Sequence, residues 1–204
     1  ELLLANKQRK KIKPAIFVEK DQDFITDWAK LAGFRSPSFF KIECKKDLVE
    51  KWKDTEEAEV HYSNGGVDTE TISETKFERV IYEIYLENRN DVPLSNLKFE
   101  YRIFYEQSVN ADQAGKLSTS RNNKNGELKV NRLSPKAKMV LKTEAVVIHE
   151  KEYVGEITSG GSNFAKESGE IKGVWIKIHT KTASGETVTR DVYEPEKIKG
   201  KYVW

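Results

Sequence analysis

The sequence predicts an all-β protein built as an antiparallel β-sandwich with an N-terminal helical extension. About seven segments have strand character, at a spacing typical of a sandwich. In the clearest of them, Leu97–Glu106, apolar and polar residues alternate, as in a strand with one face on a core. Strands do not alternate with helices, which argues against a parallel α/β sheet. We therefore divide the chain into a leader and helix (1–37) and a sandwich (38–204).

Composition and charge argue against several classes of protein. The 204 residues include 35 Lys+Arg and 33 Asp+Glu, and the net charge of +2 argues against nucleic acid as a partner. An aromatic content of 10% is too high for a disordered chain. The single cysteine, Cys44, excludes an internal disulfide and a cysteine-rich zinc site. No apolar run approaches the roughly eighteen residues of a membrane span, so we expect no transmembrane segment.

The first 19 residues form a basic leader. They could be a solvated chain end, or they could contact an anionic surface in a salt-sensitive way. Leu2–Leu4 could also be the remainder of a removed hydrophobic segment. Because the chain begins at Glu1 without methionine, we expect its natural start to be missing, and a signal peptide could have been removed. The positive charges of the leader are Lys7, Arg9, Lys10, Lys11 and Lys13.

Residues 21–33 are predicted to form a helix. Acids at its start and Gly33 at its end fit the preferences of helix termini. We expect Trp28 to pack the helix onto the sandwich, and the alternative is a helix that binds a partner. The spacing of one apolar stripe is followed by Phe24, Ile25, Trp28, Leu31 and Ala32.

From residue 36 onward the composition and pattern of the sequence are typical of strands and turns. Residues 45–60 fit either a helical turn or a continued strand, and Asn64–Gly66 is a strong turn signal. Residues 107–125 are predicted to be a polar loop, and residues 155–170 a glycine-rich loop. The predicted strands are Ser38–Cys44, Val80–Leu86, Leu97–Glu106, Gly126–Val130, Lys138–Glu150, Ile171–Thr182 and Glu186–Tyr193, the last two forming a hairpin.

No constellation of residues indicates catalysis, a metal or a cofactor. The histidines His61, His149 and His179 lie 88 and 30 residues apart, without the spacing of metal ligands. Cys44 lies in an apolar strand pattern, where we expect it to pack as a small hydrophobe rather than act as a nucleophile. The motifs of nucleotide loops and nucleophile elbows are missing from the sequence. We therefore expect a protein that is not an enzyme.

The strand pattern places Trp175 on the face of its strand that is opposite the core. Its neighbours Val174, Ile176 and Ile178 are predicted to face inward, which puts Trp175 on the opposite face with Lys177. It could be covered by the N-terminal helix, or it could form an open platform that stacks on a sugar. The second possibility makes a carbohydrate-binding module the alternative function, with a glycan as its ligand.

A motif at residues 84–105 resembles one in a known family. The motif consists of Ile84–Arg89, the turn Pro93–Leu97 and the strand Phe99–Tyr105, and the ending Tyr193–Pro195 with Tyr202–Trp204 is also similar. Together these segments resemble secreted Ig-like proteins of Verrucomicrobia and related bacteria, including those of the type IV pilus-like gene cluster of Akkermansia. The resemblance is best over residues 75–204, and residues 1–37 match nothing in it.

The resemblance implies an Ig-like sandwich and an exported protein of the outer membrane, cell surface or periplasm. It carries over no functional residues. We expect a non-enzymatic protein of adhesion or pilus-type assembly, with protein partners or self-assembly at the envelope. Physically, the motif places Asn88 and Asn96 at strand ends, where side chains bond the backbone of turns, and Leu94 and Leu97 at the end of the sandwich.

The leader also contains a short apolar run with strand character. Exposed sheet edges invite the addition of a strand from another chain. The run could pair with an edge of its own sandwich, or it could add to a neighbouring copy and give a homo-oligomer. The candidate interaction residues of this run are Ile16, Phe17 and Val18.

Overall fold

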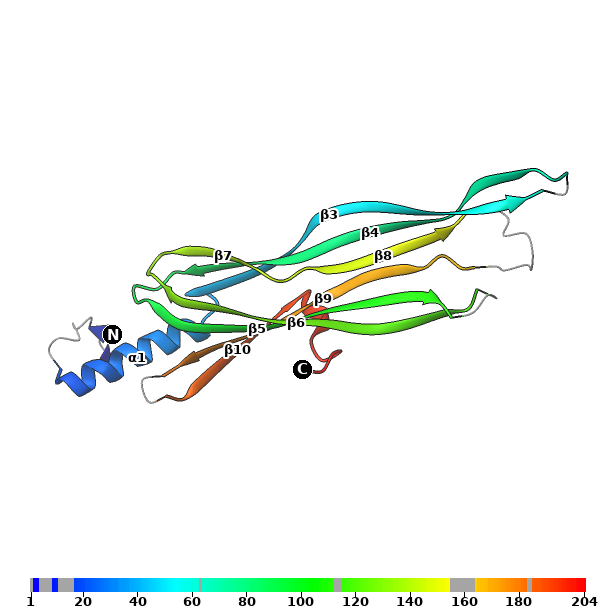
Figure 1. Cartoon of the computed structure of the whole chain (residues 1–204). Helices are drawn as coiled ribbons and strands as arrows, with labels where there is room; N and C mark the ends of the chain where they lie inside the picture. The colour runs from blue at the N-terminus through cyan, green and yellow to red at the C-terminus, as the bar shows by residue number, and fades with distance from the viewer. Residues whose placement is uncertain are drawn as a thin grey trace.

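The chain forms two antiparallel β-sheets packed face to face, with one helix at the N-terminal end (Figure 1). The computed structural model describes residues 2–3, 9–10, 17–62, 64–111, 115–154, 164–182 and 185–204. The predicted fold class is therefore confirmed. The elements are β1 (Leu2–Leu3), β2 (Arg9–Lys10), α1 (Glu19–Arg35), β3 (Phe40–His61), β4 (Val67–Asn88), β5 (Leu94–Asn110), β6 (Leu117–Leu133), β7 (Lys138–Lys142), β8 (Val146–Tyr153), β9 (Ser168–Lys181), β10 (Thr187–Glu194) and the 3₁₀ turn η2 (Glu196–Ile198).

The order of the strands is that of an Ig-like sandwich. One sheet has the order β3-β4-β7, with β8 also pairing with β4, and the other has the order β10-β9-β5-β6. In immunoglobulin terms, the first sheet holds strands A, B and E, and the second holds G, F and C with an added edge strand. β1 and β2 pair only with each other, apart from both sheets.

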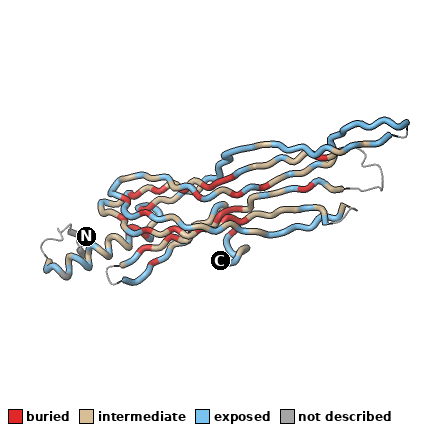
Figure 2. Tube along the Cα trace, viewed as in Figure 1, coloured by how far each residue is buried: buried red, intermediate tan, exposed pale blue. Residues whose placement is uncertain are grey.

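The core lies where the two sheets face each other, and its alternation matches the prediction for β5. Leu97, Phe99, Tyr101 and Ile103 are all buried, and so are Val174, Ile176 and Ile178 of β9. Figure 2 shows that buried residues gather in this part, whereas the far end of β3 and β4 is exposed. The β3–β4 hairpin therefore extends beyond the core as a long arm (Figure 1).

The helix exists, but the prediction of how it packs is wrong. Phe24 and Trp28 are 71% and 64% exposed, and only the C-terminal end of α1 is anchored, through the buried Phe34. Arg190 of β10 fixes this end, because its Nη1 donates to the carbonyl oxygens of Phe34 (3.2 Å) and Phe40 (2.8 Å). The helix projects from the end of the sandwich, which leaves most of its apolar stripe without a surface to cover (Figure 1).

Several strand boundaries also differ from the prediction. Residues 107–125 are mostly strand, because β5 and β6 pair regularly from Leu94–Leu133 to Asn110–Leu117. The predicted strand 138–150 is interrupted at 143–145, whereas residues 45–60 continue β3, which is one of the two alternatives that their sequence allowed. The interruption has a structural role, since Thr143 Oγ1 accepts the N–H of Tyr82 at 2.9 Å. Most of the predicted loop 155–170 lies outside the described residues, and β9 begins at Ser168.

The asparagine predicted to stabilise the turn after β4 does so. Asn88 is buried, and its Nδ2 donates to three carbonyl oxygens at 3.0–3.1 Å, those of Val92, Leu133 and Ser134. Leu94 and Leu97 are buried beside it, as expected. This turn carries the chain from one sheet to the other, so Asn88 ties the corner of the sandwich together.

Cys44 packs against the core, as the strand pattern predicts. Burial raises the pKa of its thiol to about 12. The thiolate is the reactive form, and an ordinary cysteine has a pKa near 8.5. At pH 8 we therefore expect Cys44 in the folded protein to react with an aromatic disulfide reagent about a thousandfold more slowly than in urea-unfolded protein. Fast modification of the folded protein, at the rate of the unfolded chain, would show that the thiol is accessible and ionised.

Candidate functional site

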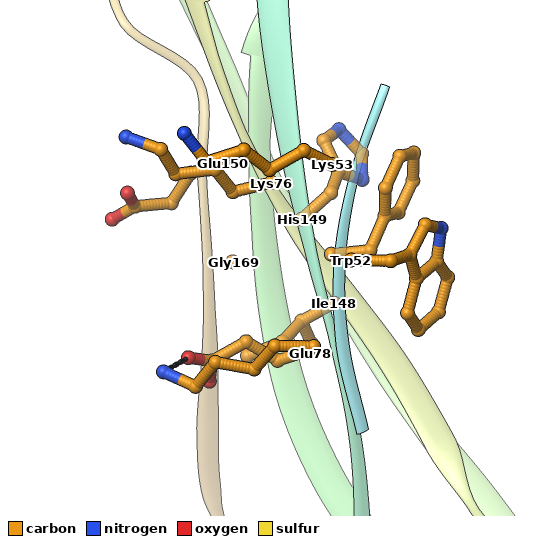
Figure 3. Close-up of a pocket in the computed structure, with 10 residues that line it drawn as sticks. Trp52, Lys53, Lys76, Glu78, Ile148, His149, Glu150 and Gly169 are labelled. Carbon is orange, nitrogen blue, oxygen red and sulfur yellow. Dashed lines mark ion pairs between the residues drawn. The ribbon is translucent and has the colours of Figure 1, made fainter.

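The sheet β3-β4-β8 carries a cavity beside the start of β9, with a volume of about 480 Å³ (Figure 3). The strand register places its side chains in two rows, Lys51–Glu78–Ile148 and Lys53–Lys76–Glu150. Figure 3 shows the lysine and glutamate side chains on the side of the sheet toward Gly169, and Trp52 and His149 on the other side. A Cβ at Gly169 would lie 2.7 Å from Ile148 Cβ, so glycine is what allows β9 to approach so closely.

Ion pairs within the chain neutralise the charges that line this cavity. Lys51 Nζ lies 2.6 Å from Glu78 Oε1. Lys53 and Lys76 share Glu74 at 3.0 and 3.1 Å, and hydrogen bonds from both lysines lower the pKa of that carboxyl. Each of the three lysines that line the cavity therefore has a carboxylate partner within the chain, although Lys53 and Lys76 share one.

Three rings pack against one another on the opposite side of the same strands. Trp52 and Phe77 are register partners and stack with ring centroids 5.1 Å apart, and His149 is tilted against Phe77 at 5.9 Å. The guanidinium of Arg79 lies 5.4 Å from the Trp52 ring. These contacts stiffen the base of the β3–β4 arm.

Next to His149, a polar cluster joins the two sheets. The Gln107 amide donates to the His149 carbonyl oxygen at 3.1 Å, and Glu167 Oε2 lies 3.5 Å from His149 Nε2. Burial tends to raise the pKa of Glu167, but hydrogen bonds from Asn110 and His149 outweigh it, so the pKa lies below its ordinary value. Asn110 donates its backbone N–H to Glu167 at 2.9 Å. The cluster fastens β8 to β5 and β9, and its groups are engaged with one another.

Trp175, the predicted platform residue, lies on the outer face of the second sheet, where it is covered by a residue other than those of the N-terminal helix. Its indole N–H donates to Asp191 Oδ1 at 2.7 Å, and its ring lies 5.1 Å from that of Tyr193. The cover is Trp204, whose ring meets Trp175 edge-on at 4.9 Å. The helix α1 does not take part, so Trp175 is neither under the helix nor an open platform.

The C-terminal segment, Lys201–Trp204, is held on this face by two aromatic contacts and two cations. Tyr202 stacks on Phe104 at 4.3 Å, and Lys177 Nζ lies 4.3 Å from the centre of the Trp204 ring. Arg102 lies 4.9 Å from the same ring, and its Nη1 donates to the Val203 carbonyl oxygen at 3.4 Å. We call this set of sheet residues the aromatic seat: Arg102, Phe104, Trp175, Lys177 and Tyr193.

The structure describes only some of the predicted leader residues. Arg9 and Lys10 form β2, and Lys7, Lys11, Lys13 and Ile16 lie outside the described residues. Phe17 and Val18 directly precede α1, since Val18 is its N-cap and Gln22 Nε2 donates to the Phe17 carbonyl oxygen at 2.6 Å. Neither residue belongs to a described strand, so they do not pair with an edge of their own sandwich; the addition of this run to a neighbouring copy stays a prediction.

Sequence reasoning missed the cavity and the partner of Trp175. The cavity depends on a register between strands about 70 residues apart, which no local pattern gives. The seat had one local signal: Tyr202 and Trp204 are spaced by two, as in a segment that presents both rings to one surface.

The described part of the chain contains no group of three or more His, Cys, Asp or Glu residues placed to hold a metal ion. Among the residues that the structure describes, no helix has both the length and the apolar character needed to cross a membrane.

Comparisons with known proteins show no family for this chain. No family model matches it, and no curated protein matches it. A solved structure, the X-ray structure of Northeast Structural Genomics Consortium target SoR45, aligns with 76% of this chain and 86% of its own, at 13% identity and a TM-score of 0.30. A likeness of this degree carries no argument about function.

Proposed function

We propose that the chain is a non-enzymatic protein of the cell envelope or cell surface that works by contacting other proteins, in adhesion or pilus-type assembly. The observation that carries the proposal is the β3–β4 arm, a pair of 22-residue strands that outruns the core. Such an arm contributes little to folding stability, because it buries little apolar surface. It does present a long strand edge to another chain, with two exposed apolar residues near its tip, Tyr62 and Val67.

The chemistry of the cavity and the polar cluster supports the same proposal. Both consist of charges and hydrogen-bonding groups that satisfy one another, as in a rigid surface. The envelope location rests on the resemblance of residues 84–105 to secreted Ig-like proteins. We therefore expect cell fractionation to recover the protein with the envelope or periplasm, and an antibody to label it on intact cells if it lies at the surface. Recovery from the cytosol alone would contradict the location.

Shortening the arm tests the mode of contact. Replacing residues 59–69 with Asn-Gly joins the register partners Ala58 and Glu70 through a two-residue hairpin turn. Because nearly all the removed residues are exposed, the melting temperature should change by only a few degrees. We expect association, measured by sedimentation velocity over a concentration series, to weaken at least tenfold.

A control for the arm replacement lies on β6, the edge strand of the other sheet. The exposed pair Ser118→Ala and Ser120→Ala on β6 alters the surface of another edge strand without shortening it. If the arm is the contact, this control should associate like the unaltered protein. An arm-shortened protein that associates as strongly as the full chain would refute contact through the arm.

The alternative function is a carbohydrate-binding module that stacks a sugar on Trp175. Trp204 covers this ring, so a sugar could reach it only by displacing the C-terminal segment. Glycan-array binding that is abolished by Trp175→Ala would favour this alternative over protein contact.

A further inference from the structure

We propose that the aromatic seat is an exchange site, at which Tyr202–Trp204 of one copy can be replaced by the same segment of a second copy. The proposal rests on the proposed function in that both make a second copy a partner, but it concerns a different surface from the arm. The seat lies on β5, β9 and β10 of one sheet, whereas the arm extends from β3 and β4 of the other (Figure 1).

The seat is held in shape by the sheet and does not need its occupant to form. Trp175 is fixed from below by its hydrogen bond to Asp191 and at its side by Tyr193, both on β10. Lys177 Nζ, on the same strand, also lies 5.0 Å from the centre of the Trp175 ring, so the sheet itself supplies a cation beside this ring. A seat supported in this way stays formed when the segment leaves, which is the requirement for accepting another one.

The occupant is held weakly and by its side chains. Val203, between the two anchoring rings, is 86% exposed, and Tyr202 and Trp204 are each only half-buried. One long hydrogen bond, from Arg102 to the Val203 carbonyl oxygen, joins its backbone to the sheet. The same contacts are open to an identical segment from another copy, since every group on the receiving side belongs to the sheet.

The connection to the body of the protein favours exchange. The buried Ile198 ends the anchored part, and the chain then turns tightly, with the Lys201 N–H bonded to the Ile198 carbonyl oxygen at 3.0 Å and Gly200 at φ 77°. A short, tight hinge between a body and an exchangeable segment is the usual setting of domain swapping, because opening it releases the turn while the contacts are regained in the partner.

A complementary pair of variants tests the exchange in the absence of competition from the C-terminal segment of the receiving copy. One variant lacks residues 202–204 and keeps an empty seat, and the other carries Trp175→Ala and keeps its segment. The first is labelled with ¹⁵N and the second is added in increasing amounts up to about 1 mM. We expect the Trp175 indole N–H resonance of the first variant to move toward its position in the full chain.

A third protein, with Trp204→Ala added to the Trp175→Ala variant, should produce at least a tenfold smaller shift at the same concentration. Should Trp175→Ala fail to fold, Arg102→Ala with Lys177→Ala removes both cations of the seat from exposed or half-buried positions and takes its place. An unmoved indole resonance at 1 mM, with all proteins folded, overturns the exchange. A failure of the exchange would say nothing about association through the arm. Likewise, a failure of the arm-shortening test would leave the exchange proposal intact.

Discussion

Replacing Tyr101 with alanine should lower the free energy of unfolding by about 3–5 kcal/mol, the range measured for large buried aromatic side chains. Tyr101 is 1% exposed in the centre of β5. Its ring lies over Gly126 of β6, where a Cβ would come within 2.1 Å of the tyrosine oxygen. Its hydroxyl accepts the N–H of Glu144 at 2.8 Å, which ties β5 to the break between β7 and β8. Alanine would leave a cavity and an unbonded N–H together.

Urea unfolding monitored by tryptophan fluorescence measures this loss. With an m-value of roughly 2–3 kcal/mol per molar urea, the midpoint should fall by about 1–2 M. Tyr101→Phe keeps the ring and removes only the hydroxyl, so it should cost about 1 kcal/mol. Tyr62→Ala at the tip of the arm is the matched control, because Tyr62 is 44% exposed and should cost under about 1 kcal/mol. Equal losses at Tyr101 and Tyr62 would contradict the packing described here.

The core of this fold could be predicted from sequence because one face of β5 and one of β9 are buried. Apolar and polar residues must alternate along a strand with one buried face, so the sequence itself shows that Leu97, Phe99 and Tyr101 face the core. β6 gives no such signal over residues 117–125, which are mostly exposed along an edge of the sheet. Its strand is held by backbone pairing to β5, which polar residues allow as well as apolar ones. A polar edge strand of this kind therefore resembles a loop when only its sequence is considered.

The helix illustrates a different limit. Periodicity shows that residues 24, 28 and 31 share one face, but it does not show whether the rest of the protein reaches that face. Here only Leu31 and Phe34 contact the core, and Phe24 and Trp28 lie beyond the end of the sandwich. The covering of Trp175 was missed for a similar reason, since the contact joins β9 to a segment about 30 residues later.

Asn88 was identified from sequence as a residue that stabilises a turn, and its environment predicts the second large effect. Its Nδ2 donates to three carbonyl oxygens, and its Oδ1 accepts the Asn90 N–H at 3.1 Å. Asn88→Asp has nearly the same shape but replaces the donor with a carboxylate oxygen that faces those three carbonyls in a buried site. We expect it to lower the free energy of unfolding by about 3–5 kcal/mol at neutral pH, as for other uncompensated buried charges.

The loss should depend on pH with a definite sign. Burial and the facing carbonyl oxygens disfavour the ionised form, so the aspartate introduced by Asn88→Asp has a higher pKa in the folded protein than its unfolded value of about 3.9. The destabilisation is therefore small below about pH 3.9, where the acid is neutral in both states and can still donate one hydrogen bond. It grows as the pH rises above that value and is complete once the pH has passed the folded pKa. Asn96→Asp makes the same change at an exposed position near the start of β5, and should cost under about 1 kcal/mol at every pH. Urea unfolding of both variants from pH 3.5 to pH 8 makes the comparison, and a loss at Asn88 that matches Asn96 or does not change with pH would show that the amide does not hold the corner of the sandwich.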